Sequence, residues 1–128
     1  MGVVKKEFGK NSKGEQASFY EITNAAGMKA IVTAFGATLH SLYVPDKNAV
    51  LRDVVWGYDS VQEYEIDNGP FFGATVGRIA NRTGGAVVTI NGVDYKMEAN
   101  ERTNCLHSGS QCYHVRMWNA EILDNAVK

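Results

Sequence analysis

Short alternating runs of apolar and polar residues, separated by turn residues, make up most of this chain. No long segment repeats its apolar positions with the period of a helix, and alternation over a few residues is typical of half-buried strands. We expect turns at residues 24–27 and 45–48, where Asn, Gly, Pro and Asp gather. The predicted strands are residues 18–23, 28–35, 38–44, 87–90, 93–97 and 117–123.

Two local signals are sharper than the general alternation. Asn91-Gly92 stands between two apolar runs, and both positions of a type I′ turn need a positive φ, so the pair predicts a β-hairpin. Ser60 and Glu63 have the spacing of a capping box, which predicts one or two helical turns ending near Tyr64.

Six or more short strands with closely spaced turns predict an all-β, antiparallel fold of the sandwich or barrel type. The length of 128 residues fits one domain, residues 1–128, and no repeat or linker divides it. The last predicted strand lies almost at the C-terminus with no finishing element after it. We therefore expect an incomplete domain.

Charge and composition narrow the function classes. The formal net charge is −1 and no Lys or Arg cluster forms a stripe, so we expect no nucleic-acid partner. No apolar run approaches the length of a membrane span, and the N-terminus lacks the apolar region of a secretory signal, so we expect no membrane partner and a cytoplasmic location. The two cysteines, Cys105 and Cys112, are then expected as free thiols.

Candidate chemistry gathers between Phe71 and Trp118. Residues 72–82 combine glycines with Asn81 and Arg82, whose amide and guanidinium groups can donate hydrogen bonds to sugar hydroxyls in fixed directions. His107 follows in an Asn-rich loop, and an imidazole can exchange a proton near neutral pH. On the residues alone, a strand end with surface arginines and a structural histidine remain the alternative.

The chain resembles the aldose 1-epimerases over residues 19–121. The motifs that carry the resemblance occur in the family's order and spacing, and no single one is decisive. They are Phe35-Gly-Ala-Thr-Leu39, Val54-Val-Trp-Gly-Tyr58 with Tyr64, Phe72-Gly-Ala-Thr-Val-Gly-Arg-Ile-Ala-Asn-Arg82, Ile90-Asn-Gly-Val-Asp-Tyr95, Asn100, Asn104-Cys-Leu-His-Ser-Gly109 and Arg116-Met-Trp118.

The resemblance implies a galactose mutarotase-like antiparallel β-sandwich that binds a free aldohexose such as glucose or galactose in a cleft. Asn81 and Arg82 match the family's sugar-binding pair, and His107 matches an active-site histidine near the ring oxygen and the anomeric carbon. The implied reaction interconverts the α and β anomers without a cofactor. It uses a second histidine as acid and a glutamate as base, and both belong to a later part of the family's longer chains.

From this we expect a truncated aldose 1-epimerase with little activity of its own, and the alternative is a sugar-binding remnant of the same fold without catalysis. Strand edges without partners would favour self-association. The family usually has Gly at the position of Ser108, and residues 110–115 differ from the family's loop. Cys105-x-His107 and Cys112-x-His114 are spaced too closely for a structural zinc site, so we expect no metal.

Overall fold

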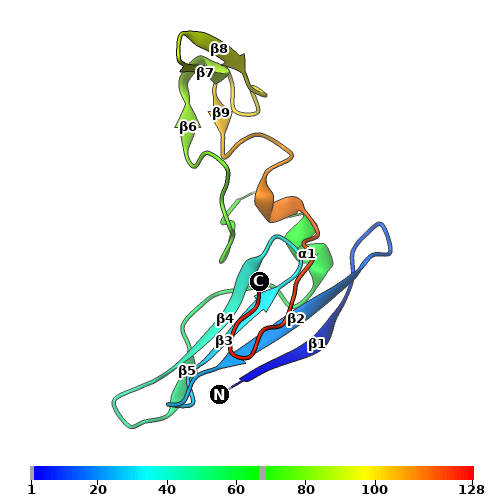
Figure 1. Ribbon diagram of the computed structural model, residues 1–128, viewed down its shortest axis with the longest axis vertical. Helices are drawn as coiled ribbons and strands as arrows, with labels where there is room; N and C mark the ends of the chain where they lie inside the picture. The colour runs from blue at the N-terminus through cyan, green and yellow to red at the C-terminus, as the bar shows by residue number, and fades with distance from the viewer. Residues whose placement is uncertain (1, 67–68) are drawn as a thin grey trace.

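A five-stranded antiparallel sheet forms the larger part of the molecule in a computed structural model that describes residues 2–66 and 69–128 (Figure 1). Its strands lie in sequence order, each beside the next. They are β1 (Gly2–Lys10), β2 (Gln16–Thr23), β3 (Lys29–Thr33), β4 (Thr38–Pro45) and β5 (Leu51–Asp53). This meander confirms the antiparallel all-β prediction, and the turns expected at 24–27 and 45–48 join β2 to β3 and β4 to β5.

The strand predictions miss β1 and β5, and they place one strand that does not form. The alternation did not reveal β1, because lysines and a glutamate occupy most of its centre, and such charged residues are common on an edge strand. Residues 117–123 were predicted as a strand and form none. They make isolated bridges instead, from Met117 to Phe35 and from Ile122 to Val127.

The predicted capping box starts the helix α1 (Val61–Ile66). The Ser60 hydroxyl accepts a hydrogen bond from the Glu63 backbone N–H and donates to the Glu63 carboxylate, at 3.3 and 2.8 Å. Val61 and Tyr64 face inward and complete the main apolar core with Ala17 and Phe35. This helix therefore covers one end of the sheet.

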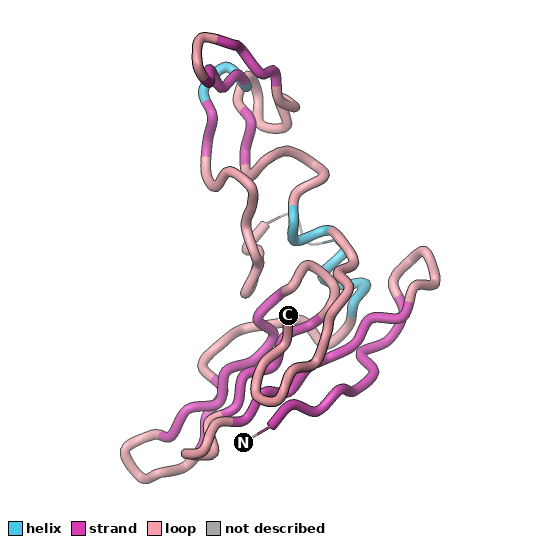
Figure 2. Tube along the Cα trace, in the orientation of Figure 1, coloured by secondary structure: helices cyan, strands magenta, loops and turns pink. Residues whose placement is uncertain are grey.

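An arm extends from the sheet and carries the remaining strands (Figures 1 and 2). It contains two small antiparallel pairs. One joins β6 (Arg82–Thr83) to β9 (Cys105–Leu106), and the other joins β7 (Val87–Ile90) to β8 (Val93–Lys96). The turn of the second pair has φ values of 53° at Asn91 and 78° at Gly92, which confirms the predicted hairpin. Short single turns, η1 (Gly84–Ala86) and η2 (Tyr113–Val115), complete the arm.

Both legs of the arm attach to the β3–β4 turn or to the start of β4. The outgoing leg accepts a hydrogen bond at the Gly73 carbonyl from the Leu39 N–H at 2.9 Å. The returning leg accepts one at the Arg116 carbonyl from the Gly36 N–H at 2.7 Å, and Trp118 N–H donates to the Ala34 carbonyl at 2.9 Å. A side chain does not fit at Gly73, because a Cβ atom there would lie 1.9 Å from the Leu39 carbonyl oxygen.

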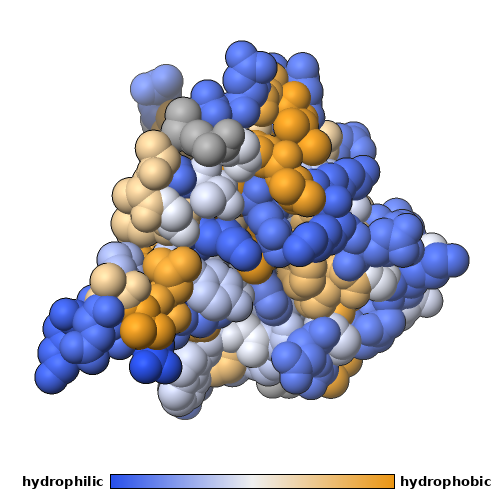
Figure 3. All heavy atoms as spheres, turned by 90° about the horizontal axis from the view of Figure 1, so that it is seen from below, coloured by the Kyte–Doolittle hydropathy of each residue, from blue (hydrophilic) through white to orange (hydrophobic). Residues whose placement is uncertain are grey.

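Much apolar surface stays exposed for a protein of this size. The accessible surface is 8333 Å² for 14.0 kDa, whereas a compact monomer of that mass exposes roughly 6,700 Å². Figure 3 shows hydrophobic residues in several separate patches on the face that it views. Within residues 2–66 and 69–128 no second large sheet faces the first. Self-association through the strand edges stays a prediction.

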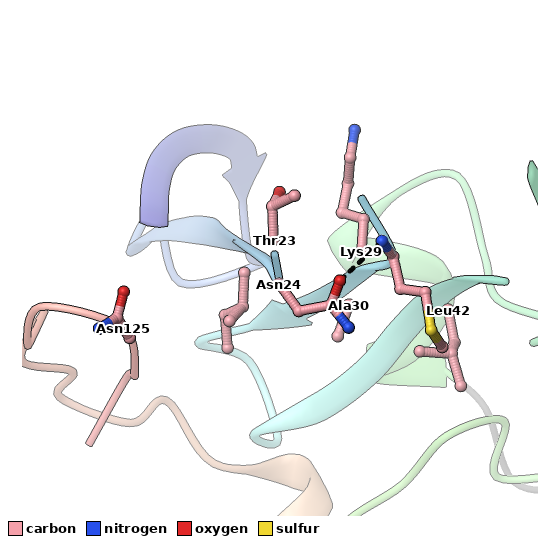
Figure 4. Close-up of a pocket in the computed structure, with 8 residues that line it drawn as sticks. Thr23, Asn24, Lys29, Ala30, Leu42 and Asn125 are labelled. Atoms are coloured by element: carbon pink, nitrogen blue, oxygen red, sulfur yellow. Dashed lines mark hydrogen bonds between the residues drawn. The ribbon is translucent and has the colours of Figure 1, made fainter. Parts of the chain in front are cut away.

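A shallow hollow of about 210 Å³ lies at the β2–β3 turn (Figure 4). Asn24 shapes this turn by accepting hydrogen bonds at its side-chain oxygen from the N–H groups of Ala26 and Met28. Asn125 reaches the hollow from the C-terminal segment. This hollow is far from the arm, so it has no part in the candidate site.

Candidate functional site

The short β6–β9 ladder brings two of the predicted site residues together. Arg82 pairs with Leu106 and Thr83 with Cys105, so Asn81 and His107 lie opposite each other at the next position. The His107 N–H donates to the Asn81 carbonyl at 3.1 Å, and the Asn81 N–H donates to the Nδ1 atom of His107 at 3.0 Å. Both residues have positive φ, 60° and 52°, so the chain bends away from the ladder at this point.

The hydrogen bond from Asn81 fixes the tautomer of His107. Because Nδ1 accepts from a backbone N–H, a neutral imidazole carries its proton on Nε2. The ring is half-buried, and its exposed part borders a hollow in the arm. His107 therefore lines this hollow with a ring whose tautomer is fixed.

Three side chains clamp the loop around His107. The Asn100 amide donates to the Leu106 carbonyl and accepts from the Leu106 N–H, at 3.0 and 2.7 Å. The Ser108 hydroxyl makes the same kind of reciprocal contact with the backbone of Ile79. The Glu98 carboxylate accepts from the N–H and the hydroxyl of Ser110, both at 2.8 Å, and these hydrogen bonds lower its pKa. The position of His107 is therefore set from both sides.

Arg82 is held by a carboxylate. Its Nε atom donates to both oxygens of Glu101, at 3.0 and 2.7 Å, and its Nη2 atom donates to one of them. Hydrogen bonding to Glu101 raises the pKa of Arg82, and the same contact lowers the pKa of Glu101. Nη1 donates to the side-chain oxygen of Asn81 at 3.3 Å. Arg82 thus lies beside Asn81, with most of its guanidinium directed at Glu101.

The hollow beside His107 has a volume of about 390 Å³. The Phe71 ring separates two imidazoles in its wall, with centroid distances of 5.8 Å to His107 and 4.8 Å to His114. The residues that line it are Phe71, Asn100, Leu106, His107, Gly109, Ser110, Cys112, His114 and Val115. Asn81 and Arg82 are not among the described residues that line this hollow. Asn81 contacts His107, which does line it. A cleft shared by Arg82 and His107 stays a prediction.

The sequence did not point to His114 as a neighbour of His107, because six residues separate them. Its Nε2 atom lies 3.4 Å from the Sγ atom of Cys112. Both cysteines are free and buried, and burial raises the pKa of Cys112. In the part of the chain that the structure describes, no group of three or more Cys, His, Asp or Glu residues could hold a metal ion.

His40 belongs to the core and not to the site. It packs 4.6 Å from the Phe19 ring, and its Nδ1 atom is hydrogen-bonded to the Tyr64 hydroxyl at 3.0 Å. Burial lowers the pKa of His40, and the charges of Asp53 and Asp59 oppose that shift.

Over residues 2–66 and 69–128, no helix has the length and apolar character needed to cross a membrane.

Comparisons of the sequence with known proteins all lead to one family. A sequence model of the aldose 1-epimerase family matches residues 18–128. Galactose mutarotase of Bos taurus is 34% identical over 79% of this chain and 29% of its own length. A probable aldose 1-epimerase of Arthroderma benhamiae is 38% identical over 80% of this chain and 24% of its own. The chain therefore spans less than a third of the length of these relatives.

Solved structures give the same picture of the fold. An aldose epimerase homologue from C. elegans superposes with a TM-score of 0.74 at 38% identity, covering 82% of this chain and 32% of the other. Galactose 1-epimerase from Lactobacillus acidophilus superposes with a TM-score of 0.74 at 21% identity, covering 93% of this chain and 33% of the other. These likenesses confirm the galactose mutarotase-like β-sandwich class. The chain covers about a third of the length of each of these structures. The chain belongs to the aldose 1-epimerase family.

Proposed function

We propose that this chain forms the sugar-positioning part of an aldose 1-epimerase site, with a free aldohexose such as galactose or glucose as its ligand. The observation that carries the proposal is the paired contact between Asn81 and His107, which fixes the tautomer of an imidazole that lines the hollow. In this role His107 donates to the sugar near its ring oxygen. Asn81 and Arg82 bind sugar hydroxyls.

A donor with a fixed position suits the opening of the sugar ring. In mutarotation a base removes the proton of the anomeric hydroxyl while an acid protonates the ring oxygen, after which the C1–C2 bond rotates and the ring closes on its other face. A fixed Nε2–H donor stabilises the charge that develops on the oxygen atoms at the anomeric centre, and it needs no reorientation during the reaction. Arg82 and Asn81 then resist sliding of the sugar past that donor.

We further propose that the 128 residues alone bind the sugar and exchange its anomers slowly. The reaction needs an acid and a base together, and each contributes about 10²–10⁴ in rate. Among the described residues, the wall of the hollow contains no carboxylate that could serve as the base. The alternative, a sugar-binding module without any catalysis, makes the same prediction for binding.

Binding and catalysis are tested separately. We expect galactose, added to the ¹⁵N-labelled chain, to shift the signals of the His107 ring and the Asn81 amide, and we expect His107→Ala to weaken this binding at least tenfold. Thr89→Val, on the outer hairpin and outside the hollow, is the matched control and should bind as the wild type does. The proposal fails if saturating galactose or glucose leaves those signals unchanged.

Polarimetry on fresh α-galactose measures turnover. A rate equal to the buffer control agrees with binding without efficient exchange. A clear rate that His107→Ala abolishes would contradict the second proposal, because it would make the 128 residues a sufficient catalyst.

A further inference from the structure

We propose that Ser108 is a positioning residue that fixes the orientation of the His107 ring by fastening the loop after it to the segment before Asn81. The proposal rests on the function proposed above only for what His107 does with a sugar. The positional role itself follows from contacts among four residues.

The contact is a reciprocal pair between one hydroxyl and one peptide. The Ser108 Oγ atom accepts a hydrogen bond from the Ile79 N–H at 2.8 Å and donates to the Ile79 carbonyl at 3.0 Å. A serine hydroxyl can do both at once because it has one donor and two acceptor positions. The two groups of Ile79 are thus satisfied by a side chain, in the way that a neighbouring strand would satisfy them.

This side chain takes over where the backbone ladder stops. The ladder runs through Thr83–Cys105 and Arg82–Leu106 and ends with the Asn81–His107 pair. It cannot continue, because His107 and Ser108 have φ values of 52° and 70°, which turn the chain away. The Ser108 hydroxyl spans the gap that this turn leaves, so the contact with Ile79 adds one more pairing beyond His107.

The pairing matters for the ring because the ring itself is held by Asn81, in the segment opposite the loop. The Asn81 N–H reaches Nδ1 of His107 only while residues 79–81 stay beside the loop. Two successive non-glycine residues with positive φ favour relaxation of that loop. The other clamps do not prevent this, because Asn100 holds Leu106 and Glu98 holds Ser110, and neither contacts Ile79. Ser108 therefore links the two halves of the site.

The test uses two substitutions with opposite backbone effects. Ser108→Ala removes the hydroxyl and keeps the unfavourable φ, whereas Ser108→Gly removes the hydroxyl and relieves it. Ser110→Ala is the matched control, because it also removes one hydroxyl of this loop, but one that contacts Glu98 and not Ile79. Amide hydrogen exchange at Ile79 and the ¹⁵N shifts of the His107 ring are measured in the full chain.

We expect both Ser108 variants to exchange the Ile79 amide about tenfold faster, the effect of losing one well-formed hydrogen bond. We also expect both to move the two ring nitrogens of His107 toward the values of a free imidazole, while Ser110→Ala leaves them in place. Signals of the five-stranded sheet should not change. The ring shift is the decisive readout, since a merely stabilising contact would not alter the tautomer.

Several results would overturn the proposal. In one, Ser108→Gly keeps the wild-type ring signals, so that the backbone and not the hydroxyl sets the ring. In another, the ring signals change equally in Ser110→Ala. Loss of the sheet signals in both Ser108 variants would make the contact a requirement for folding instead. If the ring signals respond as expected while galactose has no effect on the wild type, the positioning role stands and the proposed function fails.

Discussion

Gly73 offers a direct test of how the arm is attached. An alanine there would place its Cβ atom 1.9 Å from the Leu39 carbonyl oxygen and 2.9 Å from the Leu39 carbonyl carbon. Backbone atoms cannot move aside as a flexible side chain can, so one leg of the arm must separate from the start of β4. That separation also strains or breaks the hydrogen bond from the Leu39 N–H to the Gly73 carbonyl.

The size of the effect follows from two contributions. Gly73 has a φ of 61°, and a left-handed conformation costs a non-glycine residue roughly 1–2 kcal/mol. Loss of the Leu39 hydrogen bond adds about 0.5–1.5 kcal/mol. We therefore expect Gly73→Ala to lower the free energy of unfolding by about 1.5–3.5 kcal/mol, and by more if the overlap displaces neighbouring residues.

Urea denaturation followed by tryptophan fluorescence measures this loss. The control is Gly14→Ala, because Gly14 has a φ of 80° and no atom within 4 Å of the position of a Cβ. It should lose only the conformational contribution of roughly 1–2 kcal/mol. Equal losses in the two variants would refute the steric argument, and so would an unchanged exchange rate of the Leu39 amide in Gly73→Ala.

Two further predictions concern ionisable groups. Because burial lowers the pKa of His40 below its ordinary value of about 6.5, the unfolded chain takes up this proton first. The free energy of unfolding should therefore fall as the pH drops below about 6.5, until the folded-state pKa is reached. His40→Gln should flatten urea midpoints between pH 7 and pH 5, and an equally steep profile would show that another group is responsible. Glu101→Gln should speed exchange of the Arg82 Nε–H with water, because its carboxylate partner is gone, yet barely move the urea midpoint, since this pair is exposed. A large drop in that midpoint would contradict the second expectation.

The sequence predicted best where the responsible interaction is local. The Asn91-Gly92 turn and the Ser60 capping box each depend on residues at most a few positions apart, and both were found where expected. Residues 117–123 failed for the opposite reason. Their alternation suits a strand, but the backbone of this segment meets only single partners, such as Phe35 opposite Met117, so no ladder forms.

In the candidate site, too, some features were predictable from the sequence and others were not. The family's motifs predicted Asn81, Arg82 and His107, and the structure brings Asn81 beside His107. The clamps could not be read from the sequence, because each joins a side chain to a backbone group whose position depends on tertiary structure. The contact of Ser108 with Ile79 spans 29 positions, and the ladder that creates it has strands of two residues, too short for any periodic pattern.

The site is therefore built mainly from contacts within the arm, and this has a consequence for how binding and catalysis divide. His107 is oriented by Asn81, and its loop is fixed by Asn100, Ser108 and Glu98, without any residue of the five-stranded sheet. The sheet determines where the arm starts and returns, through the Gly36 and Leu39 contacts. A hydrogen-bond donor that is oriented in this way can be ordered before the protein groups on the other side of the sugar ring are in place. Mutarotation also needs a base at the anomeric hydroxyl, and the described wall of the hollow has no carboxylate for it. Under the proposed function, changes within the arm should therefore alter sugar affinity, whereas a general base has to reach the sugar from outside this wall.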